Sequence, residues 1–100
     1  MYARKVSLCL KSDATSQFMR KVEHEVIPLF RKQGGGLDQL ILLSDNGKMF
    51  YVYTFWENSE DAEKYDRTIL PALNKLLTAV VDGTLRVHAF AGLRGRLSSG

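Results

Sequence analysis

The first apolar pattern in the chain has a period of two. Between Tyr2 and Leu10, apolar and polar side chains alternate, which is typical of a β-strand covered on one face. The face expected to be buried carries Val6, Leu8 and Leu10, and the other carries Lys5, Ser7 and Cys9.

The next pattern has helical spacing, over residues 14–33. Its apolar stripe consists of Phe18, Val22, Val26, Leu29 and Phe30. Ser12 or Asp13 is expected to cap this helix. Pro28 predicts a kink or a loosened last turn, and Gly34 to Gly36 end the helix.

Two strands joined by a hairpin follow. Residues 37–43 form an almost continuous apolar run, so we expect this strand to be covered on both faces. Asn46-Gly47 predicts a type I′ turn, and residues 48–57, KMFYVYTFWE, form the returning strand.

A second helical stripe starts after Asn58 or Ser59, either of which suits the N-cap. The stripe consists of Ala62, Tyr65, Ile69, Leu73, Leu76, Leu77 and Val80. Pro71 is expected to split this helix in two, because proline lacks the N–H that a helix interior requires. Residues 85–90 form the last strand.

The order of these elements predicts an α+β fold of ferredoxin-like type, βαββαβ, with a four-stranded antiparallel sheet. We expect one domain over residues 1–91 and a flexible tail over 92–100. Two helices can cover only one face of such a sheet. Tyr51, Tyr53 and Phe55 would then leave a large apolar patch on the other face, which predicts a homodimer that pairs the two sheets.

Composition narrows the function classes. The net charge is +3, but the fourteen Lys and Arg are interleaved with eleven acidic residues, which argues against nucleic-acid binding. A single cysteine, Cys9, indicates a reducing, cytoplasmic setting. We expect no signal peptide, no membrane span, no metal site and no cofactor, since none of the corresponding motifs occurs.

Two segments carry a family resemblance: FYVYTFWENSEDAEKY, residues 50–65, and HEVIPLFRKQGG, residues 24–35. With them, nearly the whole chain resembles the antibiotic biosynthesis monooxygenase family of dimeric α+β barrels. The resemblance implies an enzyme that oxidises flat phenolic molecules without metal or flavin, in a pocket between sheet and helices.

Carried over by position, the family's polar residues are mostly replaced here. The tryptophan is kept as Trp56, whereas the family's asparagine and histidine fall on Val52 and Leu42. The family's helix tyrosine falls near Ala62, with Tyr65 one turn further on. In the haem-degrading branch, the corresponding positions hold Val6, Tyr65 and Lys75, which disfavours haem.

Strand parity predicts the lining of the pocket. Its members are Val6, Leu8, Leu40, Leu42, Val52, Thr54, Trp56 and Val87, closed by Phe18, Val22, Tyr65 and Ile69. We expect Trp56, Thr54, Val52, Leu42 and Val6 to contact a ligand. Tyr65 and His88 are the candidate catalytic groups, although each also fits a structural role.

Two functions remain open. One is a cofactor-independent monooxygenase that acts on a small aromatic molecule. The other is a non-catalytic dimer, serving as a ligand-binding or interaction module, whose pocket is filled by its own side chains. A cavity of at least about 300 Å³ would favour ligand binding.

Overall fold

The computed structural model describes residues 1–92. Its elements are β1 (Tyr2–Cys9), α1 (Thr15–Lys21), the π-helical turn η1 (Val22–Val26), α2 (Ile27–Arg31), β2 (Gly36–Leu43), β3 (Met49–Trp56), α3 (Ser59–Leu77) and β4 (Arg86–Ala91). The sheet is antiparallel, with strand order β2-β3-β1-β4. This confirms the predicted ferredoxin-like α+β fold. The predicted tail lies outside the described residues except for Gly92.

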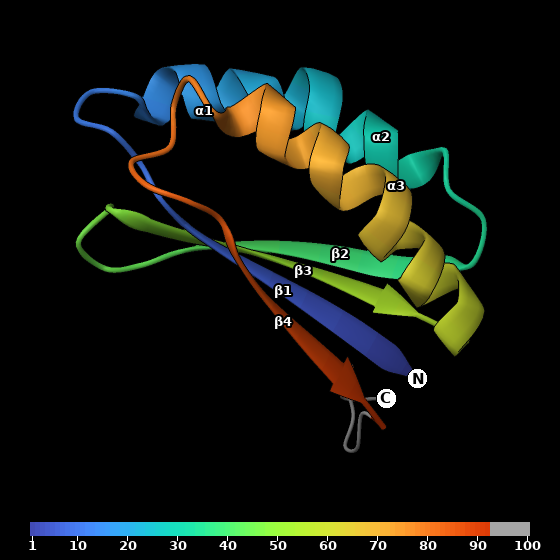
Figure 1. Ribbon diagram of the computed structural model, residues 1–100. Helices are drawn as coiled ribbons and strands as arrows, with labels where there is room; N and C mark the ends of the chain where they lie inside the picture. Colours follow the sequence, from blue (N-terminus) through green and yellow to red (C-terminus); the bar gives the residue numbers. More distant parts are fainter. Residues whose placement is uncertain (93–100) are drawn as a thin grey trace.

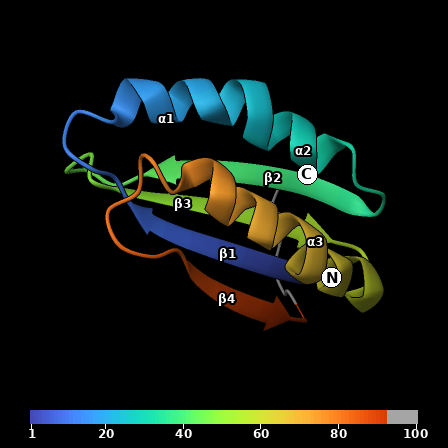
Figure 2. The ribbon, with the colours of Figure 1, turned by 45° about the horizontal axis from the view of Figure 1, so that its top comes forward.

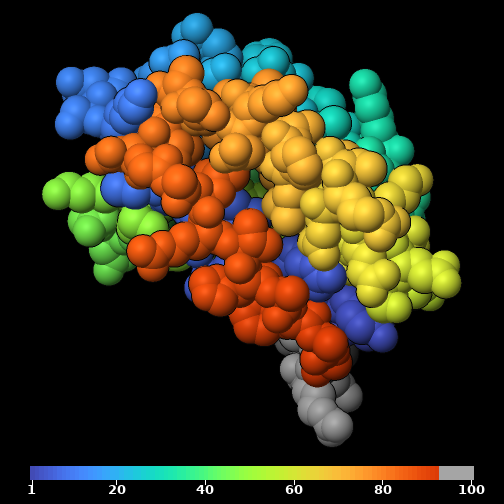
Figure 3. Space-filling model, viewed as in Figure 1, coloured from blue at the N-terminus to red at the C-terminus, as the bar shows by residue number. Residues whose placement is uncertain are grey.

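The molecule has two layers. Figure 1 shows all helices above one face of the sheet, and no other part of residues 1–92 covers the opposite face. Figure 2, in which the molecule is turned, shows the α1–α2 segment and α3 side by side, with β4 at the edge of the sheet beyond α3. β1 remains visible between α3 and β4 in the space-filling view of Figure 3. The helices therefore cover the centre of one face and leave β4 exposed.

Pro28 explains the irregular middle of the first helical segment. A proline at this position cannot donate a hydrogen bond to His24, four residues earlier, as an α-helix requires. The turn before it widens, and the Ile27 N–H donates to the Val22 carbonyl instead. The predicted loosening is thus a π-helical turn. The predicted cap was wrong, because Ala14 stands at the N-cap without a side-chain hydrogen bond.

Pro71, in contrast, does not split α3, which runs without a break from Ser59 to Leu77. The proline is exposed, so the Arg67 carbonyl that loses its partner can turn to water. The prediction of two pieces was therefore wrong. At its start, the Asn58 side chain accepts a hydrogen bond of 3.0 Å from the Asp61 N–H, as one of the two predicted caps.

The hairpin joins β2 and β3 where it was predicted, but by another turn. The Gly47 N–H donates to the Ser44 carbonyl at 2.9 Å, so Asp45 and Asn46 are the central residues. Within this turn, only Gly47 has a positive φ, of 72°. The type I′ prediction was wrong, since that turn needs positive φ at both central residues.

The register of β2 corrects the predicted pocket lining. Leu40 lies opposite Tyr53, and Leu42 opposite Tyr51, so both leucines face away from the helices. Leu42 is 48% exposed. We expected both on the helix side. That prediction was wrong because a run of adjacent leucines has no alternation from which a face can be read.

The bare face of the sheet, called the open face below, carries many large side chains. On β3 these are Met49, Tyr51, Tyr53 and Phe55. The same face carries Leu40 and Leu42 on β2 and, beyond β1, His88 and Phe90 on β4. The Tyr53 and Phe55 rings stack at 6.3 Å. Val87 lies on the helix side, as predicted, but β4 is uncovered there and Val87 is 44% exposed.

Among the described residues, no helix is long and apolar enough to span a membrane.

Candidate functional site

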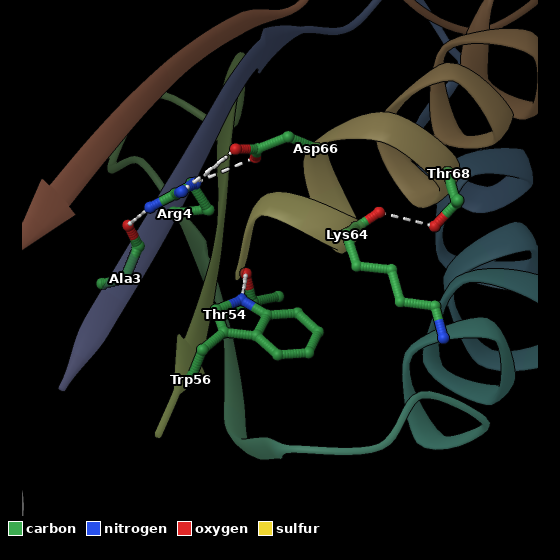
Figure 4. Close-up of polar contacts among 7 residues, drawn as sticks. All are labelled: Ala3, Arg4, Thr54, Trp56, Lys64, Asp66 and Thr68. Atoms are coloured by element: carbon green, nitrogen blue, oxygen red, sulfur yellow. Dashed lines mark hydrogen bonds and ion pairs between the residues drawn. The ribbon is translucent and has the colours of Figure 1, made fainter. Parts of the chain in front are cut away.

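Trp56 is the centre of the aromatic cluster on the helix side. It ends β3, is 1% exposed, and packs between two rings. Phe30 approaches it edge-on at 5.4 Å, and Tyr65 lies tilted against it at 5.1 Å. The indole N–H donates to the Thr54 hydroxyl at 3.1 Å, as Figure 4 shows. The tryptophan is therefore held in place by both packing and a hydrogen bond.

Tyr65 brings a polar group into this cluster without a partner for it. Its ring comes from α3 and is 2% exposed. The buried hydroxyl makes no hydrogen bond within residues 1–92. An unpaired buried hydroxyl is costly, and in folded proteins such a group usually contacts a water molecule or a ligand.

The surroundings keep the Tyr65 hydroxyl protonated. Burial raises the pKa of Tyr65 from 10.0 to about 12, and the Asp66 carboxylate adds to that increase. The Thr54 hydroxyl and the Arg4 guanidinium oppose it. Thr54 is close enough to act on the pKa, although the two hydroxyls do not meet in hydrogen-bond geometry. At neutral pH, Tyr65 can therefore donate a hydrogen bond but cannot serve as a base.

Arg4 and Asp66 form an ion pair beside this cluster. Arg4 Nε lies 2.9 Å from one carboxylate oxygen, and its terminal nitrogen lies 3.0 Å from the other. Figure 4 shows the guanidinium reaching from β1 to α3, with a further bond to the Ala3 carbonyl. Asp66 is thus occupied by Arg4 and is not a free base. Our sequence reasoning missed this pair, although Arg4 has the same strand parity as Val6 and Leu8.

A hollow of about 450 Å³ lies between α2 and β2, next to the aromatic cluster. Its lining includes Phe30, Gly36, Gln39 and Ile41. Gln39 lies opposite Thr54 in the sheet, and Gly36 lies opposite Trp56. The hollow therefore adjoins the aromatic cluster around Trp56. A methyl group on Gly36 would stand 2.8 Å from the Phe30 ring, which explains the glycine there.

The predicted site residues divide between the two faces of the sheet. Val6, Val52, Thr54, Trp56 and Tyr65 come together on the helix side, all buried. Leu42 and His88 lie on the open face. Tyr65 and His88 therefore do not form one site within a chain. Within the described part of the chain, no group of three or more His, Cys, Asp or Glu could hold a metal ion.

Solved structures resemble this fold, whereas no family model and no curated protein sequence matches the chain. A structure from Nitrosomonas europaea, assigned as an antibiotic biosynthesis monooxygenase, has a TM-score of 0.77 at 21% identity and covers 94% of this chain and 100% of its own. A monooxygenase from Streptomyces coelicolor, solved with nanaomycin D, has a TM-score of 0.75 at 17% identity, with 98% and 92% covered.

A third structure, from Deinococcus radiodurans and assigned in the same way, has a TM-score of 0.73 at 17% identity and covers 100% of both chains. At these identities, the likeness shows the fold. This chain has the fold of the antibiotic biosynthesis monooxygenases, as its resemblance to the family predicted.

Proposed function

We propose that this chain binds a flat, largely apolar aromatic molecule, of the phenol or quinone class, between its helices and its sheet. The observation that carries the proposal is the Tyr65 hydroxyl, which is buried among aromatic rings without a partner. A ligand oxygen in hydrogen-bond contact with it would satisfy this group. The rings around it would pack against the faces of a planar ligand.

The hollow beside α2 is the entrance in this proposal. Its volume of about 450 Å³ is within the range of small-molecule pockets. Phe30 stands between the hollow and Trp56, since it lines the one and contacts the other. In this proposal, the Phe30 ring moves to open a path from the hollow towards the Tyr65 hydroxyl.

The residues on this side favour binding over a complete catalytic apparatus. Tyr65 can donate a hydrogen bond to a phenolate or to the oxyanion of a developing intermediate. The adjacent acid, Asp66, is paired with Arg4, so the cluster contains no free base. Oxidation without a cofactor would therefore act on a substrate that enters already ionised. The similarly folded Streptomyces coelicolor monooxygenase, solved with nanaomycin D, supports a small-molecule ligand in this fold.

The proposal includes a homodimer formed through the open face. Leu42, opposite Tyr51, is 48% exposed there, and Phe90, opposite Ala3, is 47% exposed. A monomer would expose this patch to water, and a second copy of the sheet would remove it. The two-layer fold offers no segment within residues 1–92 that covers this face.

The alternative function, a non-catalytic interaction module, is favoured by a different observation. Trp56, Thr54 and Tyr65 are only 0–2% exposed, so the predicted pocket is filled by its own side chains. In that case, the aromatic cluster is a packed core and the Tyr65 hydroxyl is simply left unpaired.

Fluorescence of Trp56, the only tryptophan, tests the proposal directly. We expect planar phenols and naphthoquinones to quench its emission saturably. Tyr65→Phe should weaken binding by about tenfold, the cost of a hydrogen bond of about 1.4 kcal/mol. Thr68→Ala is the matched control, because it removes an exposed hydroxyl from the same helix and should leave the affinity unchanged.

Two results would leave the alternative standing: no saturable quenching by any flat aromatic, or equal affinities for the wild type and Tyr65→Phe. If binding is found, oxygen consumption in the presence of the ligand distinguishes an oxygenase from a binding protein. Consumption that depends on Tyr65 would identify the helix-side cluster as the catalytic site.

A further inference from the structure

The middle of the open face carries two basic side chains. Across the sheet, Tyr53 on β3 lies opposite Lys5 on β1, and Lys5 lies opposite His88 on β4. Exposed apolar residues lie on both sides of this row, with Leu42 on β2 and with Phe90 next to His88 on the same face of β4. A second copy of the sheet that removes both apolar residues from water therefore covers Lys5 and His88 as well.

Lys5 is held on this face by aromatic rings. Its Nζ lies 5.0 Å from the centre of the Tyr51 ring and 5.9 Å from that of Tyr53. The face of an aromatic ring attracts a cation, so the two tyrosines stabilise the lysine charge in apolar surroundings. Lys5 can therefore keep its charge when a second copy covers it, provided that no further positive charge is placed beside it.

The charged groups around His88 decide what a proton on it would meet. Lys5 lies directly opposite, and Arg86 lies two positions earlier on the same face of β4. Asp82, in the turn before β4, lines a hollow together with Arg86 and His88, whereas Asp38 lies on β2, at the far edge of the sheet. Within residues 1–92, neither Lys5 nor His88 takes part in an ion pair. A protonated His88 would therefore face the lysine charge without a carboxylate of its own.

We propose that acid separates the two copies, because a proton on His88 places a second positive charge beside Lys5 in the interface. Like charges directly opposite each other destabilise paired strands, and the repulsion grows when water is removed. In the separated chains His88 is exposed, so water solvates its charge. Histidine gains its charge between about pH 8 and pH 5, so the dissociation constant should rise as the pH falls through this range. The inference rests on the proposed homodimer and not on the helix-side ligand.

Light scattering over a dilution series of the full-length protein, at pH 7.5 and at pH 5.5, tests the inference. We expect the dissociation constant of the wild type to be at least about tenfold higher at pH 5.5, since two histidines gain charge in each dimer. Circular dichroism at both pH values shows that the chains stay folded, so that the change in mass reports on pairing alone.

Three substitutions identify the charges responsible. His88→Gln keeps a polar side chain that cannot gain a proton, so this variant should dimerise equally well at both pH values. His24→Gln is the matched control, because His24 is the only other histidine, is exposed on η1, and should leave the acid response unchanged. Lys5→Met removes the neighbouring charge and should reduce the acid response although His88 remains.

A wild type that dimerises equally well at both pH values, or more tightly at pH 5.5, overturns the inference and leaves the pairing itself intact. An acid response that persists in full in His88→Gln, or that is lost in His24→Gln, also overturns it. A wild type that is monomeric at both pH values refutes the proposed homodimer and this inference with it. The helix-side ligand is read separately, from Trp56 fluorescence.

Discussion

Both faces of the sheet carry aromatic rings, but in different surroundings. On the helix side, Trp56 is fully enclosed, in contact with Phe30 and Tyr65. On the open face, Tyr51 and Tyr53 are half-buried and lie beneath Lys5. β3 contributes to both sets, because its successive side chains point to opposite faces. One strand thus adds rings both to a packed core and to a surface that needs a partner.

The difference shows that aromatic content alone does not identify a binding site. The enclosed cluster has an unpaired hydroxyl and an adjoining hollow, which are the features that favour a ligand there. The open face has a large exposed apolar area, which favours a second copy of the sheet. Each prediction below changes one face while leaving the other intact.

The largest effect is expected for Trp56→Ala. It removes a large ring from a fully packed site, which costs about 3–5 kcal/mol of unfolding free energy. Urea denaturation followed by circular dichroism measures the loss. Leu43→Ala, at a position that is 52% exposed, should cost less than about 0.5 kcal/mol. A small loss for Trp56→Ala would contradict the enclosed packing on the helix side.

Tyr53→Glu tests the open face. If two copies pair through this face, the glutamate is buried at the interface without a partner, which costs about 3 kcal/mol or more. The dimer should then dissociate at least about 100-fold more readily, because 1.4 kcal/mol corresponds to a factor of ten.

Light scattering over a dilution series measures this change. Gln17→Glu adds the same charge on the exposed side of α1 and is the matched control. A wild type that is monomeric at micromolar concentration would refute the pairing altogether.

Gly36→Ala should have an intermediate effect. The added methyl group would lie 2.8 Å from the Phe30 ring, so the ring must shift or the backbone must yield. Overpacking of this kind costs about 1–3 kcal/mol. Gly34→Ala is the control, since an added methyl group there meets nothing within 4 Å. Equal stability of the two variants in urea would show that Phe30 is not held tightly at the entrance.

Much of this fold could be predicted from the sequence, because alternation and helical spacing are local signals. Val6, Val52 and Trp56 were assigned to the helix side from parity, and the register confirms that side. The prediction for Leu42 was wrong because β2 has no alternation, so only its pairing with β3 decides its face.

The polar part of the site was harder to predict. The Arg4–Asp66 pair joins residues 62 positions apart in the chain, and no local pattern indicates that they meet. Tyr65 and His88 were both plausible catalytic groups in the sequence, and only the strand register shows that a sheet lies between them. Pairing between distant residues, rather than residue type, decided these outcomes.

The smallest effect is expected for Tyr65→Phe, and it depends on pH. At neutral pH the substitution removes an unpaired hydroxyl and should change the unfolding free energy by less than about 1 kcal/mol. The pKa of Tyr65 is raised to about 12 in the folded state, from 10.0. Between these values the folded protein holds a proton that the unfolded chain releases, so rising pH destabilises the fold. The wild type should therefore lose stability from about pH 10 towards pH 12 more steeply than Tyr65→Phe.

Urea denaturation of both proteins at pH 9 and pH 11 measures the difference, with Thr68→Ala as a control that should follow the wild type. Parallel losses in the wild type and Tyr65→Phe would mean that water reaches the hydroxyl, and the enclosed face would then be less sealed than the packing around Trp56 indicates.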